Sequence, residues 1–173
     1  MRTPMVLGGW IAAASLLAGG CGGNAGGGET ADPQVARPAG TVEGTVRQTG
    51  SPPAVQTRLE TEDGSVRVVG ALAAEVGRVI GAVVRVRGPL GSEAGERTIE
   101  ARDYQIVSVD GRSPRVGEIV PADDGGLALR GRDGTLTPLR DAPERLRGAI
   151  GAWAWVVPSQ DGGVARYGIL RDP

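Results

Sequence analysis

The chain has 173 residues, with 19 basic and 20 acidic side chains and a net charge of −1, so it lacks the basic excess typical of nucleic-acid-binding domains. It has no histidine, a single cysteine, and arginine as its only basic residue. This composition excludes zinc sites built from His and Cys, Schiff-base lysines and any disulfide within the chain. Carboxylates, hydroxyls, Tyr and Arg remain for chemistry, and we expect no cofactor and no metal.

The first 20 residues have the pattern of a secretory signal. Arg2 is followed by an apolar run over residues 5–18, and small residues then lead into Cys21. The run is shorter than the ~20 apolar residues that a transmembrane helix needs, so we predict a signal peptide over 1–20. A free cysteine in a secreted chain is unusual and requires a role.

The small residues before Cys21 resemble the lipobox of bacterial lipoproteins, although Ala18 stands where that family prefers leucine. The resemblance implies cleavage between Gly20 and Cys21, a diacylglycerol on the Cys21 sulfur, and a fatty acid such as palmitate on the new amino terminus. Because Gly22 is not the aspartate-type signal for inner-membrane retention, the resemblance implies a cell-envelope protein on the outer membrane, facing the periplasm, if the source is Gram-negative. An ordinary secretory signal with an unrelated cysteine is the alternative.

Residues 21–40 are rich in Gly and Pro and nearly free of large apolar side chains. Such a segment cannot bury enough surface to offset the entropy lost on ordering. We therefore expect a flexible tether that holds the folded part just off the membrane.

From Thr41 onward the pattern becomes that of a β protein. Short Val-rich runs bounded by Gly, Pro and Asp are typical of strands, and Asp-Gly pairs supply the turns between them. The apolar positions of this kind lie at 42–46, 59, 66–69, 83–86, 99 and 104–109. Leu72, Val76 and Val79 recur at helical spacing and predict one short helix over 71–79.

The second half repeats the first with an offset of 70 residues. Matches at a turn, a helix end and a strand start indicate two copies of one structural unit. Tyr104 and Tyr167 occupy equivalent places in the two copies, where we expect packing with each hydroxyl bonded to the backbone. The segments that match are 63–64 with 133–134, 71–79 with 141–149, and 80–82 with 150–152.

Each copy is expected to have five strands with a short helix between the third and the fourth. This order resembles the OB-fold, a small five-stranded barrel. We therefore predict a mostly β protein with two tandem OB-like barrels, at 41–112 and 113–173. The second falls short of a complete barrel if 116–120 and 127–129 cannot supply its first two strands. A pair of SH3-like barrels and a single merged sandwich are the alternatives.

Trp153 and Trp155 lie two apart in an expected strand, so both point to one face. The alignment of the copies assigns Ala154 and Val156 to the core and both tryptophans to the outer face. They are candidates for a platform that binds a sugar or a hydrophobic partner. Packing against the first barrel or the chain end is the other interpretation, which the scarcity of aromatic residues favours.

Arg85 and Arg87 alternate with valines and are candidates for an anion-binding stripe. Such a pattern is more often a solvated face that discourages edge pairing. OB barrels bind through the face of strands two and three, which makes Arg58 and Arg67 further candidates.

Without His or Lys as a general base, the sequence predicts a protein that is not an enzyme. Our leading hypothesis is a membrane-tethered envelope lipoprotein that binds a protein or glycan partner through OB-like barrels. Charge, location and few aromatics argue against nucleic acid as a partner. A structural or assembly subunit of a larger envelope complex is the alternative, and a carboxylate-based hydrolase is a minor one.

Overall fold

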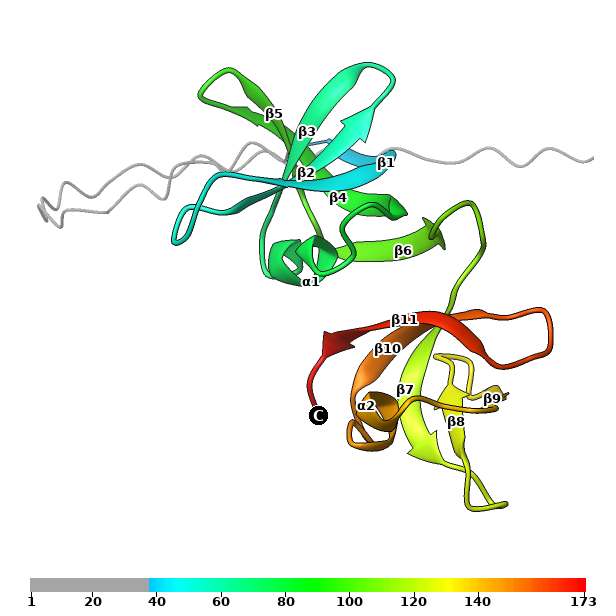
Figure 1. Ribbon diagram of the computed structural model, residues 1–173. Coiled ribbons are helices and arrows are strands. Elements are labelled where there is room, and N and C mark those ends of the chain that lie inside the picture. The colour runs from blue at the N-terminus through cyan, green and yellow to red at the C-terminus, as the bar shows by residue number, and fades with distance from the viewer. Residues whose placement is uncertain (1–37) are drawn as a thin grey trace, which may run out of the picture. The chain divides into compact units, whose positions relative to one another are not determined.

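Eleven strands and two short helices make up residues 38–173, the part of the chain that this computed structural model describes (Figure 1). The fold is mostly β, as the sequence predicts. The predicted signal peptide (1–20), Cys21 and most of the tether (21–40) lie outside the described residues. The end of the predicted tether is already structured, because the first strand begins at Ala39.

The first half closes into a five-strand barrel. Its strands pair in the order β1-β2-β3-β5-β4, and β4 pairs back with β1 to complete the circle. All pairs are antiparallel except β3 with β5. The strand β4 pairs first with β6 and then with β5, so these two behave as one strand with a bend. The strands are β1 (Ala39–Thr49), β2 (Gln56–Thr61), β3 (Gly64–Val69), β4 (Val83–Glu93), β5 (Glu96–Glu100) and β6 (Asp103–Ser108).

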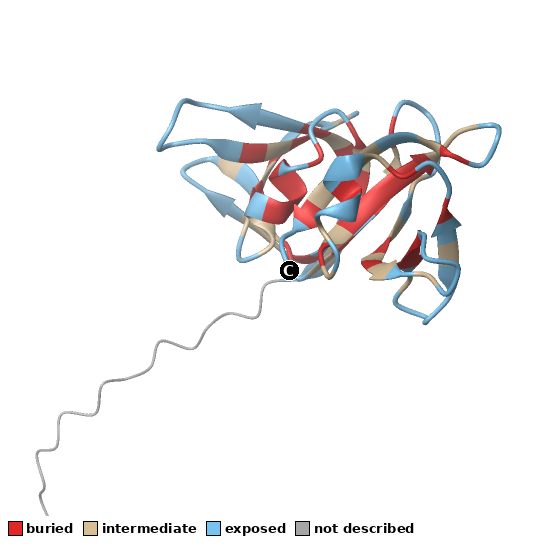
Figure 2. Ribbon diagram, turned by 60° about the horizontal axis from the view of Figure 1, so that its bottom comes forward, coloured by how far each residue is buried: buried red, intermediate tan, exposed pale blue. Residues whose placement is uncertain are grey.

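Alternating valines fill this barrel. Val84 and Val86 on β4 are fully buried, whereas Arg85 between them is half-buried and Arg87 is exposed. The period of two places successive side chains on opposite faces of a strand, so apolar alternation alone turns the arginines outward. Figure 2 shows the result, with buried positions along the strands and exposed hairpin tips.

The helix α1 (Ala73–Gly77) follows β3 and packs on the barrel with Val76 fully buried. It is shorter than the predicted 71–79, and the chain turns on either side of that range at Gly70 and Gly81, whose φ angles are 90° and 83°. Positive φ is readily available to glycine, so both residues can end regular structure there.

The second half forms a five-stranded sheet in the order β11-β10-β7-β8-β9. This is the same succession of strands as in the first half, but within residues 38–173 the edge strands β9 and β11 form no ladder with each other. A single parallel bridge joins Arg140, just after β9, to Gly163, just before β11. One closed barrel is therefore shown and a second is not, in contrast to the two predicted. The division into domains at residue 112 stays a prediction. The elements are β7 (Arg115–Pro121), β8 (Leu127–Arg130), β9 (Leu136–Leu139), α2 (Glu144–Arg147), β10 (Trp153–Pro158) and β11 (Val164–Arg171).

Matching hydrogen bonds join the turn after each helix to the first strand of the same half. The Gly81 N–H donates to the Val46 carbonyl at 2.9 Å, and the Gly151 N–H donates to the Ile119 carbonyl at 2.8 Å. Both glycines have positive φ, at 83° and 88°. In both halves, a backbone hydrogen bond from a glycine thus holds this turn against the sheet.

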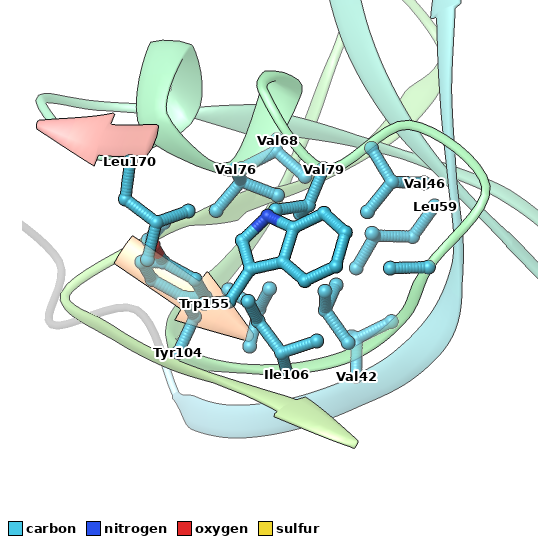
Figure 3. Packing of buried hydrophobic residues seen from close by; sticks show 14 of the residues in the cluster. Val42, Val46, Leu59, Val68, Val76, Val79, Tyr104, Ile106, Trp155 and Leu170 are labelled. Carbon is cyan, nitrogen blue, oxygen red and sulfur yellow. The ribbon is translucent and has the colours of Figure 1, made fainter. Parts of the chain in front are cut away.

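The core of the barrel is completed by side chains from the second sheet. Trp155, Val157 and Leu170 belong to the same buried cluster as the barrel valines. Figure 3 shows the Trp155 indole among the labelled side chains of this cluster, close to Val76 and Val79. In addition, Arg78 donates from Nη1 to the Leu170 carbonyl at 2.8 Å.

Within residues 38–173, no helix has both the length and the apolar character needed to cross a membrane.

Candidate ligand-binding cleft

A cleft of about 430 Å³ lies between β4 and β6 of the barrel and β10, β11 and the 131–133 turn of the second half. Four arginines from these segments reach it, together with one partly exposed tryptophan, and we call it the Trp153 cleft. Its volume falls in the range of about 300–1,000 Å³ that is usual for small-ligand sites. The residues that give it charge or aromatic character are Glu75, Arg85, Arg87, Asp103, Tyr104, Arg132, Asp133, Trp153 and Arg171.

Arg85 and Arg87 enter the cleft from the outer face of β4. They lie opposite Gln105 and Asp103 of β6 in the antiparallel register. Cross-strand neighbours on one face have Cβ atoms about 4.5–5.5 Å apart, so the ladder presents two cations, an amide and a carboxylate as one polar wall.

Trp153 forms the aromatic part of the cleft. The guanidinium carbons of Arg132 and Arg171 lie 5.8 and 5.4 Å from the centre of its ring, within cation–π range. Neither arginine is a candidate from the sequence, because one lies in a turn and the other at the end of β11. No motif connects these positions, and only the packing of the two halves brings them together.

The base of the cleft holds a buried carboxylate that is likewise not a candidate from the sequence. Glu75 on α1 is 8% exposed. The Tyr104 hydroxyl donates to its Oε1 at 2.7 Å, and Arg171 Nε lies 3.0 Å from its Oε2. The Tyr104 hydroxyl therefore bonds a side chain and not the backbone partner we predicted. This triad links α1, β6 and β11 and holds Arg171 beside Trp153.

The pKa of Tyr104 is raised well above its ordinary value of 10.0, first by burial of the ring and then by the hydrogen bond to Glu75 and its negative charge. The unfolded chain loses this proton near pH 10, whereas the folded protein retains it. The contribution of protonated Tyr104 to the free energy of unfolding is therefore fully present below about pH 10 and is lost as the pH rises above that value.

We expect the urea midpoint to fall above about pH 10, and tyrosinate absorbance from Tyr104 to appear only on unfolding. Tyr104→Phe identifies that residue's share of the absorbance and should flatten the pH dependence. A Tyr104 that ionises near its ordinary pKa in the folded protein would contradict the buried contact.

Three of the four cleft arginines have a carboxylate partner, and Arg87 has none among the described residues. Arg87 is also exposed, which leaves its guanidinium open to a ligand. Solvent-exposed ion pairs contribute only about 0–1 kcal/mol, so a ligand anion can compete for Arg85 and Arg132 as well, whereas Arg171 is held by the buried Glu75. The pairs are Arg85 with Glu43 at 2.7 Å, Arg132 with Asp103 at 3.3 Å, and Arg171 with Glu75 at 3.0 Å.

Trp155 does not line this cleft. It is only 7% exposed and packs in the barrel core, so its candidate role in binding is corrected to a role in packing. Ala154 and Val156 lie in the core of the second sheet. The strand β10 thus separates two cores, and the face that Trp155 shares with Trp153 is covered by the barrel.

Arg58 and Arg67 lie apart from the cleft, on the adjacent strands β2 and β3, where they are register partners. Arg58 Nη2 donates to Glu96 Oε1 at 2.7 Å, and Arg67 pairs with Glu93. The Arg58 hydrogen bond is the main cause that lowers the pKa of Glu96. Two arginines thus face two carboxylates here, and this surface offers less free positive charge than the Trp153 cleft.

Over residues 38–173, no group of three or more Cys, Asp or Glu side chains is arranged to hold a metal ion.

No protein-family model and no curated protein sequence matches the chain. Among solved structures, the chain is similar to a deletion mutant of the single-stranded DNA binding protein from Thermus aquaticus, at 16% identity and a TM-score of 0.25. The match covers 75% of this chain and 92% of that one. At this TM-score the likeness supports no conclusion about this chain, and the description of the barrel rests on its strand order.

One prediction about partners is corrected. We expected no nucleic acid among the partners, and the similar structure is that of a single-stranded DNA binding protein. The exclusion rested on net charge, location and few aromatics, which are properties of the whole chain. A local cleft with four arginines and a tryptophan departs from that average, so the exclusion is dropped.

Proposed function

We propose that this chain is a membrane-tethered, non-catalytic binding module of the cell envelope, whose protein or glycan partner binds in the Trp153 cleft. One observation carries the proposal: Arg85, Arg87, Arg132 and Arg171 converge around Trp153 from separate segments of the chain. Hydrophobic surface beside a few well-placed polar groups is the usual composition of a ligand site.

The protonation states in the cleft support binding and not catalysis. Arginine stays protonated at every working pH and cannot act as a general base. Both oxygens of Glu75 are engaged, by Tyr104 and by Arg171. The raised pKa of Tyr104 keeps its hydroxyl protonated. General acid–base catalysis needs a group that can exchange a proton at the working pH, and neither the arginines nor Tyr104 supplies one.

The tether and anchor rest on the sequence. A lipobox-like segment ending at Cys21 and a Gly- and Pro-rich stretch precede the folded part, which begins at Ala39. A flexible tether of this kind would hold the cleft near the membrane surface, on the outer membrane facing the periplasm if the source is Gram-negative.

Palmitate labelling of cells tests the anchor. The full chain should take up the label and sediment with membranes, whereas Cys21→Ser should remove the label and release the chain. An unlabelled wild-type chain would refute the lipid anchor and leave the cleft to be tested separately.

Partner binding is tested by retention of envelope fractions on the immobilised full chain. Trp153→Leu combined with Arg87→Gln should abolish retention. Arg97→Gln is the matched control, because Arg97 is an exposed arginine outside the cleft. Equal retention by the double variant would refute the cleft as the binding site.

A second function, an assembly subunit of a larger envelope complex, is favoured by one observation. The strand β9 has a single ladder partner, β8, and Leu136 on β9 is 57% exposed. Unpaired strand edges are a common route to association with another chain. A complex of fixed stoichiometry that survives the cleft variants but is lost in Leu136→Lys would favour this function.

A further inference from the structure

We infer that the ligand of the Trp153 cleft is an acidic sugar unit, whose single carboxylate or phosphate group binds Arg87 while its ring packs beside Trp153. This inference rests on the proposed function and narrows its partner to an anionic glycan.

The charge of the cleft points to a ligand with one anionic group. Its lining contains four arginines and three carboxylates, and Glu43 outside the lining pairs with Arg85, so an added anion needs an arginine that has no partner. Arg87 is the one arginine of the four without a carboxylate partner among the described residues, and it is exposed. A guanidinium group matches the geometry of a carboxylate or a phosphate with two parallel hydrogen bonds. The one guanidinium group of the four that lacks a partner in the described part of the chain, that of Arg87, therefore favours a ligand with one anionic group. Arg85 lies next to it on the same face of β4.

The wall beside Arg87 suits hydroxyl groups. Gln105 and Asp103 lie opposite Arg85 and Arg87 in the β4–β6 ladder. An amide both donates and accepts, and a carboxylate accepts only, so the wall offers donors and acceptors in alternation. Sugar hydroxyls, which also donate and accept, are the natural complement of such a mixed wall.

The aromatic side of the cleft suits the apolar face of a sugar ring. Trp153 is held by the guanidinium groups of Arg132 and Arg171 at 5.8 and 5.4 Å, and Glu75 fixes Arg171 in turn. A side chain held in this way loses little freedom when a ligand binds, which favours affinity. The pyranose ring exposes C–H groups that pack against such a surface.

Single-stranded nucleic acid is the competing ligand. Binding along a phosphate backbone uses a groove of several free cations and a series of stacking aromatics. In this cleft Trp153 is partly exposed while Tyr104 is buried, and of the four arginines Arg87 alone lacks a carboxylate partner within residues 38–173. This arrangement of free cations and exposed aromatic rings thus fits one acidic sugar unit better than a row of phosphates. The experiment below includes probes for both ligands.

Calorimetric titration of the full chain in detergent micelles tests the inference with four probes. They are oligogalacturonate, a neutral galactose oligomer of equal length, a hexose phosphate and an oligothymidylate. We expect the carboxylated oligomer or the hexose phosphate to bind at least about tenfold more tightly than the neutral sugar, because hydrogen bonds between a guanidinium group and an anion are stronger than those between neutral groups. Which of the two binds more tightly distinguishes carboxylate from phosphate.

Two variants and one control assign the effect to residues. Arg87→Gln should remove the preference for the acidic sugar, whereas Arg97→Gln, with the same change of charge outside the cleft, should keep it. Trp153→Leu should weaken acidic and neutral sugars alike. Unchanged far-UV circular dichroism and a melting midpoint well above the temperature of the titration exclude unfolding as the cause.

The remaining outcomes overturn the inference. Equal affinity for acidic and neutral sugars, or an Arg87→Gln variant that keeps the preference, refutes the binding of an anionic group by Arg87. Tighter binding of oligothymidylate with a steep salt dependence assigns the cleft to nucleic acid. If no probe binds but envelope fractions are still retained through the cleft, the ligand class fails while the proposed function stands.

Discussion

Replacing Trp155 with alanine should lower the free energy of unfolding by about 3–5 kcal/mol, the usual cost of deleting a large buried aromatic side chain. The indole is 7% exposed and packs with Val157 and Leu170 against the valines of the barrel (Figure 3). Its loss would leave a cavity where the second half contacts the first, so the two halves should lose part of their cooperativity.

One feature of Trp155 sets the expected value within that range. Its Nε1 is buried and has no hydrogen-bond partner in the described residues. A buried N–H without a partner costs about 1–3 kcal/mol, and the alanine variant removes this cost together with the ring. We therefore expect a loss near the lower end of the range, and a smaller loss for Trp155→Phe, which keeps a ring without the N–H.

Thermal unfolding followed by far-UV circular dichroism provides the measurement. At roughly 2–4 °C per kcal/mol for a chain of this size, the midpoint of Trp155→Ala should fall by roughly 10 °C. Trp153→Ala is the matched control on the same strand face and should lose less than about half as much, because Trp153 is partly exposed. Equal losses in the two variants would contradict the burial of Trp155.

Replacing Gly88 with alanine should destabilise the barrel by about 3 kcal/mol or more, at or above the upper end of what overpacking usually costs. A Cβ atom at this position would lie 1.8 Å from the backbone oxygen of Glu100. Neither partner is a flexible side chain, so β4 and the bend between β5 and β6 must separate. Arg87 is the neighbouring residue, and its carbonyl accepts a hydrogen bond from the Arg102 N–H at 3.0 Å, which this separation would strain.

Urea denaturation of Gly88→Ala should show a lowered midpoint, and the variant should also bind the ligand of the Trp153 cleft less tightly. Gly148→Ala is the control, since the nearest atom to its added Cβ lies at 3.8 Å and its φ is −79°. That change should stay within about 0.5 kcal/mol of the wild type. A Gly88→Ala variant with wild-type midpoint and slope would show that the close approach of the two segments does not occur.

Local periodicity accounts for the parts of the fold that were predictable. Alternation of valine with polar residues on β4 is enough to place Val84 and Val86 inside and Arg85 and Arg87 outside, whatever the rest of the chain does. The helix after β3 and the turns at glycine have the same local origin. For this reason the mostly β character and an OB-like barrel could be predicted, and two of the cleft arginines were identified.

Closure of the second barrel could not be predicted in this way. It depends on a parallel pairing between β9 and β11, which are separated along the chain and, within residues 38–173, are linked only through the adjacent Arg140–Gly163 bridge. Non-local pairings carry no local pattern, because their stability depends on where both strands already lie.

The sequence by itself determined the alternation of each strand, the outward direction of Arg85 and Arg87, and the shared face of Trp153 and Trp155. A period of two cannot distinguish two residues that share a face, so it left open which tryptophan is buried. Only the tertiary structure decided that the barrel covers Trp155 and leaves Trp153 at the rim. It also decided the list of charged groups that meet there from distant segments, namely Glu75, Arg132 and Arg171. The physical reason is that backbone geometry repeats over a few residues, whereas the cleft is lined by residues that are far apart in the sequence and meet only when the two halves pack together.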